Sequence, residues 1–210
     1  MNPVRKSISN IVNDKRKYRS LSANLSNGVN KAVFLDRDNT LIKLLKPRLI
    51  NTTLGRVLND CVIRPSEIKF CPGVIGSLKL LQAKGYKLII ITNQSVVARG
   101  VITEVELKRI HRRLIDLLRN QGVKIAGVYY CPHHPEGLIK KYRRKCCCRK
   151  PEPGMIKRSA REHRIDLKQS FFVGDSENDF RAGQKAGVKP IIIKPGEGFS
   201  RAIREILQYD

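Results

Sequence analysis

Two aspartates separated by one residue, Asp36 and Asp38, directly follow the apolar run Val33-Phe34-Leu35. The apolar run predicts a buried strand that ends in two carboxylates. On extended backbone the two alternate residues would share a face, whereas a turn after Asp36 would direct both into one pocket. Two carboxylates this close repel each other unless a cation or a shared proton separates them. The pair therefore predicts a divalent metal, a proton shuttle, or both, and hard oxygen ligands of this kind suit Mg²⁺.

Three further segments, far from this pair in sequence, carry polar groups that such a site needs. Thr92-Asn93-Gln94-Ser95 offers hydroxyl and amide donors, Arg149-Lys150 precedes a Pro-Glu-Pro-Gly turn, and Gly174-Asp175 is followed by Asp179. Each segment alone also has a simpler explanation. Thr92 could cap a loop, Lys150 could belong to a solvated basic run, Asp175 could lie in a plain turn, and Asp179 could lie in the first turn of a helix. Together they predict one pocket with acidic residues for a metal and donors for an oxyanion.

A cluster of cysteines forms a second candidate metal site. Cys131-Pro132-His133 and Cys146-Cys147-Cys148 contain two short chelating pairs, C-x-H and C-x-C. Cys131, His133, Cys146 and Cys148 would make a tetrahedral Cys₃His zinc site, with His134 as a spare ligand and the choice among the adjacent cysteines open. The alternative is a set of unliganded thiols in a basic loop. A zinc here would be structural and would pin the loop that presents Arg149 and Lys150.

The elements that must position these groups alternate along the chain. Short apolar runs predict strands buried on both faces of a parallel sheet, and the intervening segments predict helices. One helix opens at Thr103, where Glu106 completes a capping box, and buries Leu107, Ile110, Leu114 and Leu117. The alternation predicts a doubly wound, mostly parallel α/β sheet with its active site at the carboxyl ends of the strands. The expected strands are 32–36, 87–92, 126–131, 171–175 and 190–194, and the expected helices are 73–84, 103–117, 154–163, 178–186 and 200–207.

Two segments depart from this alternation, a long insertion at 43–69 and a loop at 131–150 rich in Pro, Cys and Lys. Residues 31–210 are expected to form one domain. Residues 1–30 are rich in Ser, Asn, Lys and Arg and are expected to be a flexible basic extension, either inert or an arm for nucleic acid or membrane.

The charge balance restricts the partners of the chain. Lys and Arg number 42 and Asp and Glu 18, which gives a formal net charge of +24 in 210 residues. This excess favours anionic partners such as phosphorylated small molecules, nucleic acid or anionic membranes, without choosing among them. No run approaches the length of a membrane span and no signal-peptide pattern opens the chain, so we expect a cytoplasmic protein.

The four motifs D-R-D-N-T, T-N-Q-S, R-K-P-E-P-G-M and V-G-D-S-E-N-D resemble, in that order, those of the haloacid dehalogenase superfamily of phosphohydrolases. The resemblance covers about residues 31–195. It implies that Asp36 is the nucleophile and Asp38 the general acid and base. Mg²⁺ would be held by the Asp36 carboxylate, the Asp38 carbonyl and Asp175. Further implied contacts are Thr92, Asn93 and Lys150 to the phosphoryl oxygens, and Asp179 to Lys150 or a metal-bound water.

The pattern C-P-H-H-P-E-G…C-C-C-R-K-P-E-P-G-M is similar to one branch of that superfamily, which contains heptose-bisphosphate and histidinol phosphatases. The resemblance implies a zinc-bound specificity loop, no large cap domain, and removal of the 7-phosphate of D-glycero-D-manno-heptose 1,7-bisphosphate by a monomer. Implied substrate contacts are Asn93, Gln94, Ser95, Arg99 and Arg149.

The chain departs from the branch at three places. Asn39 replaces a glycine but tolerates the left-handed backbone that the turn needs. Val96 replaces a glycine and is expected to narrow the rim of the pocket, and the basic segment 43–69 replaces a shorter loop that helps to choose substrate. Three alternatives therefore stay open: histidinol phosphate, a 3′-phosphate on nucleic acid, and a zinc-ribbon-like nucleic-acid-binding module on an inactive scaffold.

Overall fold

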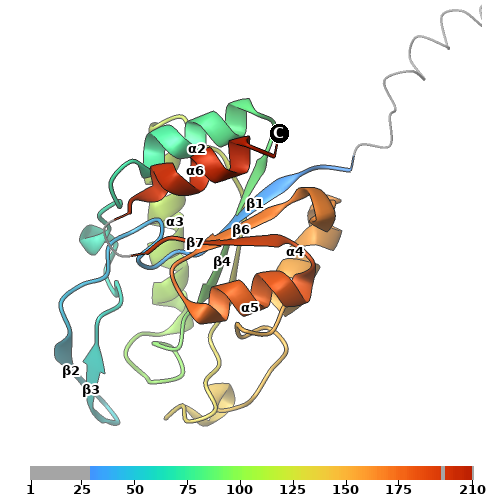
Figure 1. Cartoon of the computed structure of the whole chain (residues 1–210). Coiled ribbons are helices and arrows are strands. Elements are labelled where there is room, and N and C mark those ends of the chain that lie inside the picture. The colour runs from blue at the N-terminus through green and yellow to red at the C-terminus, as the bar shows by residue number, and fades with distance from the viewer. Residues whose placement is uncertain (1–28, 195–196, 210) are drawn as a thin grey trace, which may run out of the picture.

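A five-stranded parallel sheet in the order β5-β4-β1-β6-β7 forms the centre of the computed structural model, which describes residues 29–194 and 197–209 (Figure 1). The strands are short and apolar because helices cover both of their faces, as the sequence pattern predicted. Their bounds are β1 Ala32–Leu35, β4 Lys87–Asn93, β5 Ile125–Cys131, β6 Phe171–Gly174 and β7 Lys189–Ile192.

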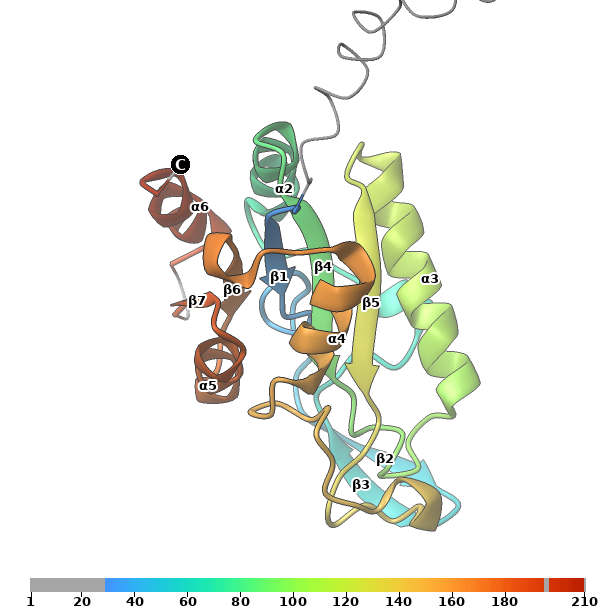
Figure 2. The same ribbon diagram turned by 90° about the vertical axis from the view of Figure 1, so that its right-hand side faces the viewer.

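Helices form a layer on each face of the sheet (Figures 1 and 2). Alternate residues of β1 point to opposite faces, so Val33 and Leu35 pack with α2, α3 and α6 while Phe34 packs with α4 and α5. This is the predicted doubly wound arrangement, which is confirmed. The helices are α2 Val74–Ala83, α3 Glu104–Asn120, α4 Gly154–His163, α5 Glu177–Ala186 and α6 Phe199–Leu207, with 3₁₀ turns at η1 Pro65–Glu67, η2 Lys140–Tyr142 and η3 Leu167–Gln169.

The helix α3 begins with the capping box that the sequence predicted. The Thr103 hydroxyl accepts from the Glu106 amide, and the Glu106 side chain accepts from the Thr103 amide at 2.7 Å. Its buried face contains Leu107, Ile110 and Leu114, but continues at Leu118 rather than at the expected Leu117, which is half-buried. The 3.6-residue period reaches Leu118 four residues after Leu114, which explains the difference.

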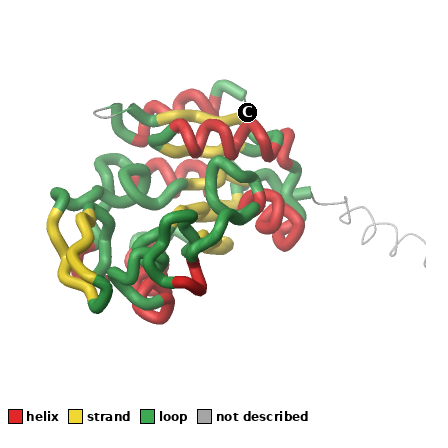
Figure 3. Tube along the Cα trace, turned by 90° about the horizontal axis from the view of Figure 1, so that it is seen from below, coloured by secondary structure: helices red, strands yellow, loops and turns green. Residues whose placement is uncertain are grey.

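The insertion at 43–69 contains an antiparallel hairpin that the sequence pattern did not predict. Strand β2 Arg48–Thr52 pairs with β3 Gly55–Asn59, and Leu49 faces Leu58 across the pair. Both leucines are more than half exposed. The hairpin and the loop after β5 lie beyond the carboxyl ends of β4 and β5, and Figure 3 looks onto this end of the molecule. There is no large cap domain among the described residues.

The sheet places the sequence motifs side by side. Leu35 of β1 is in register with Ile90 of β4 and Val173 of β6, so the three strands end at one edge. The strand order reverses direction between β1 and β6, which is where ligands bind in doubly wound sheets. Most of the expected extension at 1–30 lies outside the described residues; Asn30 is described and pairs with Ile165. No helix in 29–194 or 197–209 combines the length and apolarity that crossing a membrane requires.

Candidate active site

Lys150 lies at the centre of the site, between two carboxylates that come from different strands. Its Nζ is 2.5 Å from Oδ1 of Asp36, which follows β1, and 2.5 Å from Oδ1 of Asp179 in the first turn of α5. It also donates to the Ile91 carbonyl at 3.2 Å. All three charged side chains are buried. The ammonium group thereby fixes the orientation of the Asp36 carboxylate, and Asp179 orients Lys150.

The electrostatics of this trio follow from burial. The pKa of Asp36 is raised to about 7, mainly by burial. The charge of Lys150 lowers this pKa, whereas repulsion from Asp179 and Asp38 raises it. Burial alone would lower the pKa of Lys150, but the carboxylates of Asp36 and Asp179 raise it above its usual value. Lys150 therefore stays charged at neutral pH, whereas ionisation of Asp36 depends on further positive charge nearby.

Asp38 is held by Arg37 and Gln94. The Arg37 guanidinium donates from Nε to Oδ1 of Asp38 at 3.1 Å and from Nη2 to both carboxylate oxygens at 2.9 Å. Gln94 donates from Nε2 to Oδ2 of Asp38 at 2.7 Å and to the Thr92 hydroxyl at 2.8 Å. Gln94, expected to touch substrate, is buried in this structure and contacts Asp38 instead.

Sequence reasoning missed His111, which lies behind this group. Its Nε2 is 3.2 Å from Nη1 of Arg37, and its ring packs on Tyr130 with 5.2 Å between centroids. Burial lowers the pKa of His111 to about 3, with the charge of Arg37 as the second cause. One signal was present in the sequence: His111 lies on the apolar stripe of α3, next to Ile110 and three residues before Leu114. A histidine in such a stripe must have a buried polar partner.

The depressed pKa of His111 predicts a loss of stability in mild acid. An unfolded histidine titrates near 6.5 and the folded one near 3, so below pH 6.5 the unfolded chain binds more protons. Between pH 6.5 and 5 this group should remove about 2 kcal/mol from the free energy of unfolding, and at pH 7.5 almost nothing. Urea unfolding of the wild type and of His111→Gln at pH 7.5 and pH 5 measures the difference. Carboxylate titrations cancel between the two chains, so parallel pH dependence would contradict the prediction.

Of the remaining predicted residues near the second and third motifs, Asn93 contacts Lys150 and the two arginines contact other loops. The Asn93 side chain exchanges two hydrogen bonds with the Lys150 backbone, at 3.0 and 3.1 Å, so it positions the lysine. Thr92 is buried and Ser95 half-buried. Arg149 donates to the His133 carbonyl at 3.2 Å, and Arg99 donates to the Leu58 carbonyl of the hairpin at 3.0 Å.

The acidic groups at the ends of β1 and β6 can hold a cation. Carboxylate oxygens of Asp36, Asp175 and Asp179 lie within 4.8 Å of one another. Asn39 donates to Oδ2 of Asp175 at 2.8 Å from a left-handed backbone, φ 56°, which agrees with the expectation that an asparagine preserves this turn. Within residues 29–194 and 197–209, the buried cations paired with these carboxylates and with Asp38 are Lys150 and Arg37. The two uncompensated negative charges match a divalent ion.

The second metal cluster has the geometry of a tetrahedral thiolate site. The sulfurs of Cys131, Cys146 and Cys148 are 3.2–3.5 Å apart, and Nδ1 of His133 is 3.4 Å from Cys148 and 3.6 Å from Cys131. Hydrogen bonding from Cys131 lowers the pKa of Cys148 to about 5, and a thiolate is the form that binds metal. The donor set and spacing fit Zn²⁺. His134 takes no part, because its Nδ1 accepts from the Glu136 amide.

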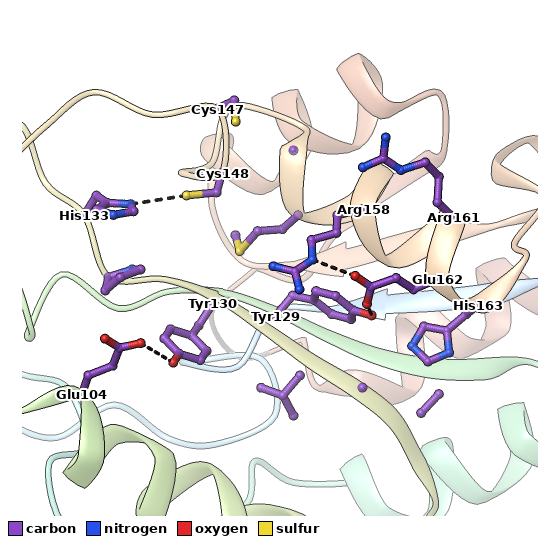
Figure 4. Close-up of a pocket in the computed structure, with 16 residues that line it drawn as sticks. Glu104, Tyr129, Tyr130, His133, Cys147, Cys148, Arg158, Arg161, Glu162 and His163 are labelled. Atoms are coloured by element: carbon purple, nitrogen blue, oxygen red, sulfur yellow. Dashed lines mark hydrogen bonds and ion pairs between the residues drawn. The ribbon is translucent and has the colours of Figure 1, made fainter. Parts of the chain in front are cut away.

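Both β5 and the loop that carries this cluster are tied to Glu104 of α3, and Figure 4 shows the bond from Tyr130 of β5. Glu104 accepts from the Tyr130 hydroxyl at 2.7 Å and from the Tyr142 hydroxyl at 2.8 Å. A groove of about 820 Å³ runs along β5 and α4 beside the loop, and the exposed Cys147 lines it together with Cys148. Asp36 and Lys150 do not line this groove.

Val96 does not narrow the rim of the pocket, contrary to the sequence expectation. Its side chain is fully buried in a cluster with Val97 and Leu107. The turn after β4 directs the side chain inward, where burying an aliphatic group is favourable. The rim at this position is therefore formed by other side chains.

A parallel doubly wound sheet with a D-x-D pair, a buried lysine and a third acidic strand end defines a phosphohydrolase of the haloacid dehalogenase type. A family model described as HAD-hydrolase-like matches residues 147–206. The chain is 38% identical over 177 residues to the D-glycero-beta-D-manno-heptose-1,7-bisphosphate 7-phosphatase of Rhodopseudomonas palustris, covering 84% of this chain and 89% of that one. It is 39% identical over 170 residues to the protein of the same name from Haemophilus influenzae, covering 80% and 84%. This chain belongs to that family of phosphatases.

A solved structure shows the same fold. The D,D-heptose 1,7-bisphosphate phosphatase of B. bronchiseptica, complexed with magnesium and phosphate, superimposes with a TM-score of 0.68 at 26% identity. The match covers 86% of this chain and 99% of that one.

Proposed function

We propose that this phosphatase removes the 7-phosphate of D-glycero-β-D-manno-heptose 1,7-bisphosphate. The observation that carries the proposal is the buried Asp36–Lys150–Asp179 trio beside Asp38 at the switch point of the sheet. The substrate and its β anomer are those in the name of the two bacterial relatives. A bisphosphate also suits Arg149 and Arg99, which are like charges close to each other. Burial is the main cause that lowers the pKa of Arg149, and the nearby charge of Arg99 lowers it further.

The reaction would proceed in two displacements. A carboxylate oxygen of Asp36 attacks phosphorus while the bond from phosphorus to the sugar oxygen breaks, and the electron pair of that bond stays on the sugar oxygen. Asp38 gives its proton to this leaving oxygen. Asp38 then takes a proton from a water that attacks the aspartyl-phosphate, which releases inorganic phosphate and restores Asp36. Lys150 holds Asp36 in place and Thr92 lies beside the phosphoryl site.

Asp36, the Asp38 carbonyl and Asp175 would hold Mg²⁺. When bound, the ion supplies the positive charge that lets an anionic nucleophile meet an anionic phosphate. Cys131, His133, Cys146 and Cys148 would hold Zn²⁺ and keep Arg149 facing the substrate. All six cysteines are free thiols, which suits a cytoplasmic enzyme. A monomer remains our expectation.

A panel of phosphomonoesters with Mg²⁺ tests the proposal. It contains both anomers of heptose 1,7-bisphosphate, histidinol phosphate and a 3′-phosphorylated oligonucleotide. We expect the β-heptose bisphosphate to give the highest kcat/KM by at least about tenfold. Histidinol phosphate and the oligonucleotide lack the heptose, and the α anomer carries its 1-phosphate in the opposite orientation. A preference for the oligonucleotide would instead favour the exposed basic residues Lys140, Lys141, Arg143 and Arg144 as a nucleic-acid contact.

A further inference from the structure

Arg37 is a buried charged side chain that touches none of the groups proposed to bind phosphate. It has no exposed surface, and it lies between the two aspartates of the D-x-D motif. Its Nε and Nη2 occupy both oxygens of Asp38, and Nη2 also donates to Oε1 of Gln94 at 2.9 Å. Since Gln94 donates in turn to Asp38, the carboxylate is held from two sides.

His111 completes the coordination of this guanidinium. Arginine nitrogens only donate, so Nε2 of His111 accepts from Nη1 and the imidazole proton is on Nδ1. The histidine is 5% exposed and is fixed by packing on Tyr130. This hydrogen bond connects α3 to the D-x-D segment. A helix that otherwise serves the core thus supports the group that moves the proton.

We propose that Arg37 and His111 are positioning residues that set the Asp38 carboxylate for proton transfer. The inference rests on the proposed function, because it assumes that Asp38 protonates the leaving oxygen. Proton transfer needs heavy atoms within about 2.6–3.2 Å, and a displacement of about 1 Å can cost about 100-fold in rate. An aspartate side chain rotates about two bonds, Cα–Cβ and Cβ–Cγ, so its carboxylate needs such restraint. His111 acts only through Arg37, and Arg37 acts only through Asp38 and Gln94.

Leaving-group dependence distinguishes positioning from a purely structural role. Para-nitrophenolate leaves without a proton, whereas a sugar alkoxide needs one from Asp38. We expect His111→Leu, which removes the acceptor, to lower kcat/KM for a sugar phosphate about tenfold more than for p-nitrophenyl phosphate, with KM little changed. His111→Gln places an amide oxygen near the position of Nε2 and should restore the sugar phosphate rate to within about threefold of wild type. A structural defect would lower both esters equally.

Three further measurements complete the test. Arg112→Leu, an exposed neighbour on α3, should leave both rates unchanged. Arg37→Lys keeps the positive charge but loses the planar guanidinium that donates to both oxygens of Asp38. It should show the same leaving-group bias as His111→Leu. Equal losses on the two esters for His111→Leu, or no recovery in His111→Gln while both variants remain folded, would overturn the inference. A wild-type enzyme silent on both esters would overturn the proposed function itself, which separates the two failures.

Discussion

Asp36→Asn is expected to lower kcat/KM for phosphate release by about 10⁴-fold or more, the scale seen when a nucleophile is removed. The amide has the shape of the carboxylate but cannot form the bond to phosphorus. The fold should persist, because Lys150 keeps Asp179 as a partner at 2.5 Å. Burial and three neighbouring carboxylates already disfavour the Asp36 charge in the absence of metal. We therefore expect the thermal midpoint of the metal-free variant to equal or exceed that of the wild type.

Phosphate release and thermal unfolding, measured on the same preparations, check both halves of this expectation. Asp116→Asn is the matched control, since Asp116 makes only an exposed pair with Arg119 on α3; it should change neither quantity. Residual turnover of Asp36→Asn above about 1% of wild type would exclude Asp36 as the nucleophile. A thermal midpoint several degrees lower would show that the carboxylate stabilises the fold rather than straining it.

Cys148→Ser is expected to abolish zinc binding and to lower activity on the bisphosphate by about 10–100-fold, as loss of an outer support of a site does. Cys148 lies two residues before Lys150, and its sulfur is 3.2 Å from Cys131 and 3.3 Å from Cys146. Losing one thiolate removes most of the affinity of a Cys₃His site and the folding free energy that metal binding contributes. The segment 146–150 would then present Arg149 and Lys150 less accurately.

Cys147→Ser makes the same chemical change one residue away and is the control. Cys147 is exposed and does not belong to the cluster. Metal analysis should find about one zinc per chain in the wild type and Cys147→Ser, and none in Cys148→Ser. Equal zinc content in the two variants would show that the cluster does not hold the metal, and unchanged turnover in a zinc-free Cys148→Ser would show that the loop needs none.

Most of the fold was predictable because its signals are local. The strands β1 and β6 consist almost entirely of buried apolar residues, and β4 contains the buried apolar run Leu88–Ile91. The capping box at Thr103 marks the start of α3. The hairpin in 43–69 was missed because its turn, Thr53-Leu54, lacks the Gly or Asn that usually signals one. Its strands also alternate only weakly, since neither face is fully buried.

The hydrogen-bond partners of the site residues were harder to predict than the motifs themselves. Arg37 and His111 are 74 residues apart in sequence, and the hydrogen bond between them depends on how α3 packs. Gln94 and Asn93 were expected to face substrate, yet their amides hold Asp38 and the Lys150 backbone. A motif gives the residue types at a strand end, but the direction of each side chain is decided by the turn and by tertiary partners.

If the cysteine cluster holds the proposed zinc, the hydrogen bonds from Tyr130 and Tyr142 to Glu104 have a consequence for enzyme that loses the ion. The bond from Tyr142 fastens the middle of the loop to α3, the bond from Tyr130 fastens the end of β5, and neither needs a metal. Loss of the ion would then release the side chain of His133 and the segment 146–150, while Tyr142 stays bound to Glu104. Resupply of the ion would require a local rearrangement, which loops complete far faster than a domain refolds. Scarcity of zinc would therefore pause this enzyme reversibly instead of destroying it.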